Sequence, residues 1–459
     1  MVYKISVTGT AVAEEVEKPS VWKEVVLSFI ASLPFLTHGI EATELYATSH
    51  SGNFIDSPEK VPWNATALIL AAAVTAPILC YISDKFGRKV GIFIVSLTQG
   101  ISCIPLFLPP NFITTLILHV VAGISTGGLF TILPIYICEI NSIKNRGLCL
   151  SFMMVMTTLA YVMKLVIDLE TMMYLMAAVV MIQLLSMLCL IESPSYCVMA
   201  GKMEIAKAKM SKLKCLENDN PNLTKELEIL RDESYRAKSH GKLTLAHILR
   251  NLIWRDATKI GVLLHTTMVL CGSIVFLDQD KTLMQLRIPS DPDRMLVLVG
   301  MFVGSLVTFL LILFVERKYI LTFGYITMVL SMGVLAIYTQ IDLTVTSLRW
   351  VPVAALAILV FGYGVAWGFP TIIVVEIYNL EIRATMVGTL FTYSQIIKLI
   401  HIHTYQYIED YMGIFVLFYI FAAINIYAGV YGLFTIPNLK DKTVKQIEKQ
   451  LKRIPLIKL

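Results

Sequence analysis

An all-helical membrane protein with twelve transmembrane helices is the fold class that the sequence predicts. The first observation is composition, because the 459 residues are 56% hydrophobic and 15% charged, with a mean hydropathy of +0.71. The second is that apolar stretches of about 20 residues, the length of a bilayer-crossing helix, recur from Val25 to Ile436. The third is that these stretches are too long and too uniformly apolar for membrane strands, and a helix satisfies its own backbone hydrogen bonds in lipid.

Twelve spans account for the apolar stretches. In chain order they are Val25–Tyr46, Ala65–Ser83, Val90–Leu108, Phe112–Ile137, Leu148–Ile167, Met172–Ile191, Lys259–Leu277, Met295–Val315, Tyr319–Tyr338, Val351–Val375, Thr385–Tyr405 and Gly413–Thr435. Lys and Arg gather after the second, fourth, eighth and tenth of them. By the positive-inside rule these loops and both termini face the cytosol, which predicts a multi-pass protein of the cell membrane.

The long polar stretch at 192–256 divides the chain into two halves. It is dense in Lys and Glu with a helical pattern, so we predict a cytosolic helical linker. The other predicted segments are a cytosolic N-terminus at 1–24, six-helix bundles at 25–191 and 257–436, and a cytosolic tail at 437–459. Asn64 opens the sequon Asn64-Ala-Thr66 on the outer side and is a glycosylation candidate.

A weak internal repeat supports two related halves. Glu139 precedes Arg146 by seven residues after span four, and Glu376 precedes Arg383 by seven after span ten, 237 residues later. A second acid and base pair recurs at a similar offset, as Asp84-Lys85 and Glu316-Arg317. Because both features lie at matching helix ends, they predict duplication of a six-span unit.

Short motifs along the whole chain carry a family resemblance. They are Asp84 to Lys89, Pro134 to Glu139 with Arg146-Gly147, Glu192-Ser193-Pro194, Glu376 with Arg383, and Pro437 with Lys442-Thr443 and Ile447-Glu448. In them the chain resembles the sugar porter family of the major facilitator superfamily, and within it the insect facilitated trehalose and hexose transporters. The resemblance implies the major facilitator fold and a small-molecule substrate, a sugar. Asn379 departs from the pattern, since the family has Pro there.

The charged residues in these motifs are candidate cytosolic gating residues. Charges at helix ends can pair between two bundles and must separate when the bundles rock apart. The candidates are Asp84, Arg88, Glu139, Arg146, Glu192, Glu316, Arg317, Glu376 and Arg383. The resemblance implies that such a latch operates in the family. The alternative is that the bases are topology signals and the acids are solvated.

The predicted substrate pathway departs from the family. A sugar hydroxyl taken from water must find a donor or acceptor. At positions where the family carries amide or indole groups, this chain carries Met154, Met268, Val269, Ile274, Thr371 and Ser394. Glu41, Gln395 and Lys398 add polar groups inside spans one and eleven. Glu41 and Lys398 either face each other across a charged cavity, or lie near the outer interface with Lys398 snorkelling.

The function predicted is a facilitative carrier of the sugar-transporter type, for trehalose or hexose by resemblance, working by alternating access. A carrier for a non-sugar solute and a non-transporting sensor or binding protein on the same fold are the alternatives. We expect no enzyme, metal or cofactor, because no nucleophile and base pair, ligand cluster or phosphate loop is evident. The expected partners are the solute and the lipid bilayer. Nucleic acid is not expected, because the bases sort by loop, and the oligomeric state is left open.

Overall fold

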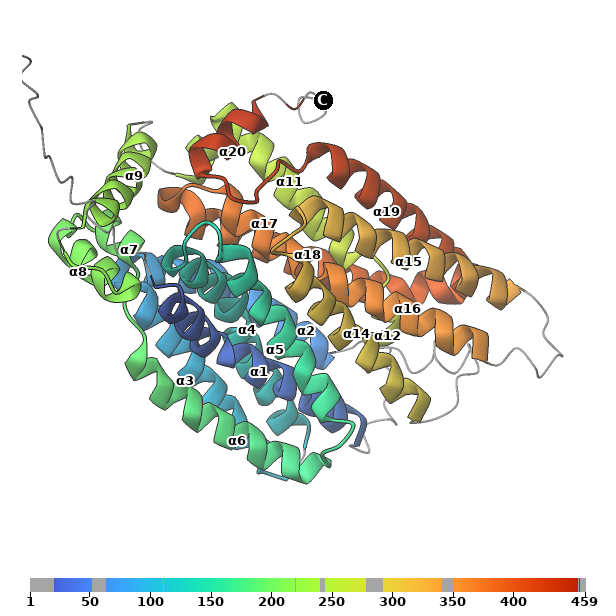
Figure 1. Cartoon of the computed structure of the whole chain (residues 1–459). Coiled ribbons are helices and arrows are strands. Elements are labelled where there is room, and N and C mark those ends of the chain that lie inside the picture. Colours follow the sequence, from blue (N-terminus) through green and yellow to red (C-terminus); the bar gives the residue numbers. More distant parts are fainter. Residues whose placement is uncertain are drawn as a thin grey trace, which may run out of the picture.

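Two groups of long helices lie side by side in the computed structural model (Figure 1). The structure describes residues 20–51, 63–109, 111–218, 220–239, 244–277, 292–340, 350–452 and 454, and these residues contain no β-strand. The first half of the chain, blue to green in Figure 1, forms one group and the second half, yellow to red, forms the other. The predicted all-helical arrangement in two halves is therefore confirmed.

Six long helices build the N-terminal half. They are α1 (Trp22–Ser51), α2 (Trp63–Phe86), α3 (Arg88–Leu106), α4 (Phe112–Ile140), α5 (Arg146–Met163) and α6 (Leu169–Ser186), and a 3-10 turn at Met187–Cys189 continues the last. Each matches a predicted span, although α5 ends four residues before the predicted Ile167. The reason is local, because Asp168 starts the next helix by accepting a hydrogen bond from the backbone N of Thr171 at 3.0 Å.

The C-terminal half contains six spans, of which two are broken. Its helices are α11 (Leu252–Val269), α12 (Ile274–Leu277), α14 (Pro292–Leu311), α15 (Arg317–Gln340), α16 (Trp350–Ala366), α17 (Phe369–Ile377), α18 (Leu380–Met412) and α19 (Ile414–Thr435). The break between α11 and α12 contains Gly272 at φ +96°, a backbone conformation that favours glycine. The break between α16 and α17 lies at Trp367 and Gly368.

Ten stretches of the described chain are long and apolar enough to cross a membrane. The predicted spans outside this set are those of α14 and α18. In α14 only Val299–Leu311 is an apolar helical stretch, and it is shorter than the other candidate spans. The helix α18 mixes the polar residues Gln395, Lys398 and His401 with its apolar residues. Both helices nevertheless pack between the others along the bundle (Figure 1).

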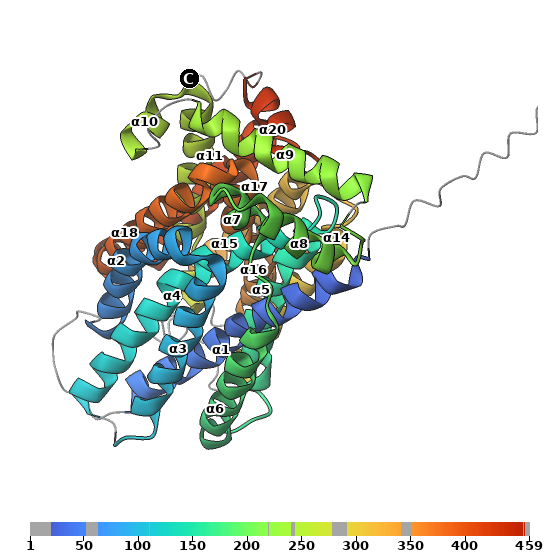
Figure 2. The ribbon, with the colours of Figure 1, turned by 90° about the vertical axis from the view of Figure 1, so that its left-hand side faces the viewer.

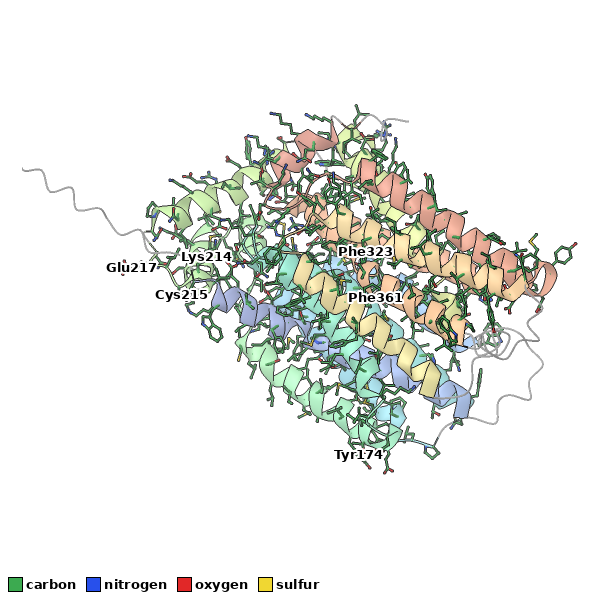
Figure 3. All side chains as sticks on the ribbon, turned by 45° about the vertical axis from the view of Figure 1, so that its right-hand side comes forward. Tyr174, Lys214, Cys215, Glu217, Phe323 and Phe361 are labelled. Carbon is green, nitrogen blue, oxygen red and sulfur yellow. The ribbon has the colours of Figure 1, made fainter. Side chains whose placement is uncertain are left out.

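Short helices cover one end of the bundle, which we call the charged end. They are α7 (Pro194–Met199), α8 (Met203–Lys214), α9 (Pro221–Lys238), α10 (Leu245–Arg250) and α20 (Val444–Leu451). Figure 2 shows α9, α10 and α20 together beyond the ends of the long helices. The first three helices share a small apolar core around Val198, Met210 and Leu223. Figure 3 labels Lys214 and Cys215 at this end and Tyr174 of α6 at the other.

The halves meet along two helix pairs, α2 with α18 and α5 with α14, and also where α4 touches α17 and α18. Along the first pair, Thr392 donates a hydrogen bond to the carbonyl of Ala73 at 2.9 Å, and Thr66 and His403 lie 3.0 Å apart nearer the other end. Within the C-terminal half, Phe323 of α15 meets Phe361 of α16 edge to face at 6.3 Å (Figure 3). One apolar core runs continuously through both halves.

Candidate functional site

A buried arginine neutralises a buried glutamate within the N-terminal half at its charged end. Arg88 opens α3 and lies beside Glu139, near the end of α4. The guanidinium donates two hydrogen bonds to the carboxylate, Nε to Oε2 at 3.1 Å and NH2 to Oε1 at 3.0 Å, and both side chains are 0% exposed. Asp84 also pairs with Arg88, and Ser193 donates a hydrogen bond to Glu139 at 2.6 Å. This bidentate geometry is the strong form of an ion pair.

The C-terminal half repeats this arrangement. Arg317 opens α15 and donates to Glu376 of α17 from Nε at 3.2 Å and from NH2 at 3.0 Å. The sequence repeat predicted Lys85 as the counterpart of Arg317, and this prediction is wrong. The counterpart is Arg88, because it is the base at the start of the following helix that reaches the glutamate. Lys85 instead lies over the ring of Phe86, with its Nζ 5.3 Å from the centroid.

Two predicted gating glutamates bind backbone rather than arginine side chains. Glu192 accepts hydrogen bonds from the backbone N of Arg88 at 2.9 Å and of Lys89 at 3.3 Å, so its charge lies at the N-terminus of α3. Glu316 accepts from the backbone N of Lys440 at 3.3 Å, which ties the C-terminal tail to the start of α15.

The charged groups that meet across the two halves lie farther apart than the paired groups within each half. Arg383 of α18 brings NH1 to 3.8 Å from Oε1 of Glu139, while its Nε donates to the carbonyl of Tyr378 at 3.2 Å. Arg146 donates from Nε to the carbonyl of Cys138, in its own half, at 3.1 Å. The Sγ of Cys138 lies 3.8 Å from the carbonyl oxygen of Val375, 237 residues away. Since 237 is also the predicted repeat offset, Cys138 and Val375 are corresponding positions of the two halves.

The linker adds a second seam that the sequence did not reveal. Glu233 of α9 accepts a hydrogen bond from the backbone N of Leu380 at 2.9 Å, and Lys238 lies 3.2 Å from Glu381. Asn379, where the resemblance implies Pro, accepts from the backbone N of Glu381 at 3.1 Å and so caps α18. The only sequence signal was the mixed charge of α9, which solvated helices also show.

Apolar side chains fill the centre of the bundle at the predicted substrate-pathway positions. Met154 is 0% exposed and packs against Gly368 of the other half, where a Cβ would come within 2.7 Å of the Met154 sulfur. Met268 and Ile274 are each 7% exposed. The remaining positions are Val269, Thr371 and Gln395, which are half-buried, and Ser394, which is buried and donates to the carbonyl of Phe391 at 2.7 Å.

A set of rings from both halves, which we call the central aromatic group, surrounds Phe130 of α4. Its other members are Phe35 and His38 of α1, Trp367 at the α16–α17 break and Phe391 of α18. Ring centroids lie 5.5 Å from Phe35, 5.2 Å from His38, 6.2 Å from Trp367 and 6.1 Å from Phe391. Sequence analysis missed this group, because single aromatic residues in apolar spans look like ordinary packing residues.

Glu41 is buried beside this group. Its side chain is 1% exposed, and its Oε2 lies 3.8 Å from Nδ1 of His38. Neither carboxylate oxygen has a hydrogen bond within the described structure. The predicted pairing of Glu41 with Lys398 across a cavity is therefore not formed. Lys398 has an exposed side chain on α18, and the snorkelling alternative stays a prediction.

Asn64 lies within the first turn of α2, and its Oδ1 is buried without a hydrogen bond in the described structure. Two residues on, Thr66 of the same sequon contacts His403 at 3.0 Å. Glycosylation stays a prediction that this helical placement does not favour.

Comparison with known proteins gives one family model across most of the chain, described as "Sugar (and other) transporter" and matching residues 35–451. The facilitated trehalose transporter Tret1 of Bombyx mori is 22% identical over 457 residues, covering 96% of this chain and 90% of the relative. The galactose-proton symporter of Escherichia coli strain K12 is 26% identical over 436 residues, covering 92% of this chain and 89% of the relative.

Solved structures of the proton:xylose symporter XylE share the fold. The structure bound to 6-bromo-6-deoxy-D-glucose has a TM-score of 0.76, with 16% identity, covering 94% of this chain and 99% of that one. The inward open conformation of XylE from E. coli has a TM-score of 0.66 with 16% identity, covering 93% and 99% of the two chains. The twelve-helix architecture is thus the major facilitator fold.

Proposed function

Because the chain belongs to the sugar transporter family, we propose that it is a facilitative solute carrier working by alternating access. In this mechanism the two halves rock about a central site, and the charged end alternately closes and opens.

The division of ion pairs at the charged end is the observation that carries the proposal. Arg88 with Glu139 and Arg317 with Glu376 each lie within one half, so neither pair has to break when the halves separate. Between the halves, Arg383 and Glu139 are 3.8 Å apart, as are the Sγ of Cys138 and the carbonyl of Val375. The strong pairs hold each half together and the weaker contacts hold the closed seam, which allows reversible opening.

We infer that the charged end faces the cytosol of a plasma-membrane protein. The positive-inside rule supports this orientation, because the basic residues following α2, α4 and α17 lie at this end. Residues 1–24, the linker at 192–256 and the tail at 437–459 are then cytosolic, and the bundles at 25–191 and 257–436 are the two rocking units.

The names of the relatives make trehalose, galactose and glucose the first solutes to test. A second candidate is a solute with fewer hydroxyl groups. Met154 and Met268, which replace hydrogen-bonding side chains at the centre, favour it.

Cross-linking between positions 138 and 375 tests alternating access. All cysteines except Cys138 are first replaced. Val375→Cys then places a second thiol across the seam from Cys138, and an oxidant should form a disulfide that holds the charged end closed. Uptake of the transported solute should then fall at least tenfold and recover on reduction. The matched control carries Val375→Cys with Cys138→Ser, and the oxidant should not affect it. Full uptake by the cross-linked protein would contradict alternating access at this seam.

A further inference from the structure

We propose that Ser239 is a phosphorylation site that releases the linker from the C-terminal tail and so favours opening of the charged end. The inference goes beyond the proposed carrier function but rests on it, since that function places the charged end in the cytosol and gives it an opening motion. Two independent features carry it. They are the basic residues before Ser239 and a cavity that this serine shares with an ion pair between linker and tail.

Ser239 is an exposed serine that directly follows the last residue of α9. Arg236 lies three residues before it and Lys238 one residue before it. Basophilic protein kinases read bases at such positions by charge complementarity. A kinase also needs its target in an extended form, and the last turn of a helix opens at little cost because helix ends fray. Ser239 therefore has both the sequence and the position of a kinase substrate.

Ser234 has the same spacing from an arginine but different surroundings. It lies three residues after Arg231, with two acidic residues between them, and its hydroxyl donates a hydrogen bond to Glu381. Its exposed fraction is only 5%. A buried serine cannot enter a kinase active site while the linker is folded, so the observations favour Ser239.

The side chain of Ser239 lines a cavity of about 110 Å³ where the linker, the C-terminal half and the tail meet. A cavity of about 150 Å³ holds benzene, so this one has room for a phosphoryl group, which is smaller than benzene. The Oδ1 of Asn251 accepts a hydrogen bond from the backbone N of Ile253 at 3.1 Å, and its Nδ2 is the donor that it offers to a phosphate. The other lining residues are Arg236, Trp254, Asn379 and Glu448.

An ion pair between Arg236 and Glu448 ties the linker to the tail, where α9 and α20 lie together (Figure 2). NH1 of Arg236 lies 3.5 Å from Oε2 of Glu448, and the two side chains are 38% and 19% exposed. The tail helix packs on α11 and α17 of the second half. The linker is joined to the first half, where the backbone N of Ser20 donates to the carbonyl of Lys214 at 3.0 Å. The pair therefore connects the two halves, and its loss favours their separation.

Phosphorylation changes the charge beside this ion pair. The Oγ of Ser239 attacks the γ-phosphorus of ATP, the bond from that phosphorus to the β–γ bridging oxygen breaks, ADP leaves, and the hydroxyl proton passes to the base of the kinase. The product carries about −1.5 to −2 charge at neutral pH. Arg236 lies one helical turn earlier on the same face and then pairs with the phosphate, while the phosphate and Glu448 repel each other.

Phosphorylation of the whole purified chain in detergent tests the inference. The probe is the catalytic domain of a calmodulin-dependent protein kinase with ATP, and mass spectrometry of the digested protein should locate the phosphate on Ser239. Cys138 reports opening, because it is buried, with its Sγ against the opposite half. With Cys138 as the only cysteine, phosphorylation should speed maleimide labelling about threefold to tenfold. An exposed ion pair shifts an equilibrium by up to about fivefold, and the repulsion adds to its loss.

Ser239→Glu and Thr224→Glu are a matched pair of variants. Both add an acid at an exposed linker position, but Thr224 lies near the other end of α9 and does not line the cavity. Ser239→Glu should speed labelling as the phosphate does, and Thr224→Glu should leave the rate close to that of the parent. In Glu448→Gln the tie is already lost, so phosphorylation should have little further effect on labelling.

The outcomes separate this inference from the carrier function. Phosphate only on Ser234 or on other residues, or no phosphate at all, would overturn the inference. Phosphate on Ser239 with an unchanged labelling rate would also overturn it, and solute uptake by the same protein would leave the carrier function standing. Faster labelling on phosphorylation, in a protein that takes up no solute, would support the release of the linker and contradict the carrier function.

Discussion

Replacing Arg383 by Gln should loosen the closed seam without unfolding either half. The Arg383–Glu139 charges are 3.8 Å apart, which gives about 4 kcal/mol of attraction at an effective dielectric constant of about 20. Most of this attraction is offset, because both groups are dehydrated in the seam and Glu139 keeps its bidentate partner Arg88 in the variant. A net loss of about 1–2 kcal/mol remains, which shifts the equilibrium toward the open charged end by about 5–30-fold.

Alkylation of Cys138 measures this shift. Cys138 is fully buried, and its Sγ contacts the opposite half, so a maleimide reaches it only when the charged end opens. In a chain that retains this cysteine alone, we expect Arg383→Gln to speed labelling by the same 5–30-fold factor. The fraction of folded protein, measured by size-exclusion chromatography in detergent, should stay close to that of the parent.

Arg88→Gln provides the contrast, because it breaks a pair inside one half. Removing one partner of a buried pair costs about 3–5 kcal/mol, so this variant should lose folded protein rather than change its labelling rate. Equal labelling rates for folded Arg383→Gln and the parent would refute the reasoning, since Arg383 would then contribute nothing to closure.

Three further substitutions test the fold. Gly272→Ala should destabilise the protein by at least about 1–2 kcal/mol, because φ is +96° and the new Cβ would meet Phe421 at 3.0 Å, and thermal unfolding in detergent should detect it. Gly333→Ala should instead stabilise α15 by about 0.5–1 kcal/mol, because nothing lies within 4 Å, and a lower melting temperature would contradict this. Burial raises the pKa of Glu448 above its ordinary value of 4.5, although the nearby Arg236 acts to lower it. The stability that Glu448 contributes is therefore present below pH 4.5 and is lost as the pH rises through the raised pKa. Glu448→Gln should therefore flatten the fall in melting temperature as the pH rises above 4.5, and an unchanged slope would exclude Glu448 as its source.

The architecture could be predicted from the sequence because bilayer thickness imposes a length on each span. The two broken spans could be located in the sequence, but their breaks at Gly272 and Gly368 could not be predicted. Whether a glycine interrupts a helix depends on the helix that packs against it. The charged motifs were found by their repetition, yet the repeat assigned the wrong base to the first half. An offset in sequence cannot show that Arg88, at the start of α3, rather than Lys85, near the end of α2, is the residue that reaches Glu139.

The centre of the protein was the least predictable part. The sequence showed which hydrogen-bonding groups were missing, but it could not show that rings far apart in the chain, such as Phe35, Phe130 and Phe391, meet in the fold. Glu41 was singled out as an unusual charge, but the sequence left open whether it pairs with Lys398 or lies near the outer interface. A helix position fixes which residues share a face, but the rotation of α18 against α1 decides which face looks inward.

The placement of the buried ion pairs bears on how the protein is made. Arg88 and Glu139 are only 51 residues apart, so both are synthesised well before α11 emerges from the ribosome. The first half can therefore enter the lipid with its buried glutamate already neutralised, and it need not wait for Arg383. The second half carries its own pair, Arg317 with Glu376, 59 residues apart. Each bundle can thus mature as a separate unit, with the joining contacts made last, so the two halves expressed as separate chains should still assemble in one membrane.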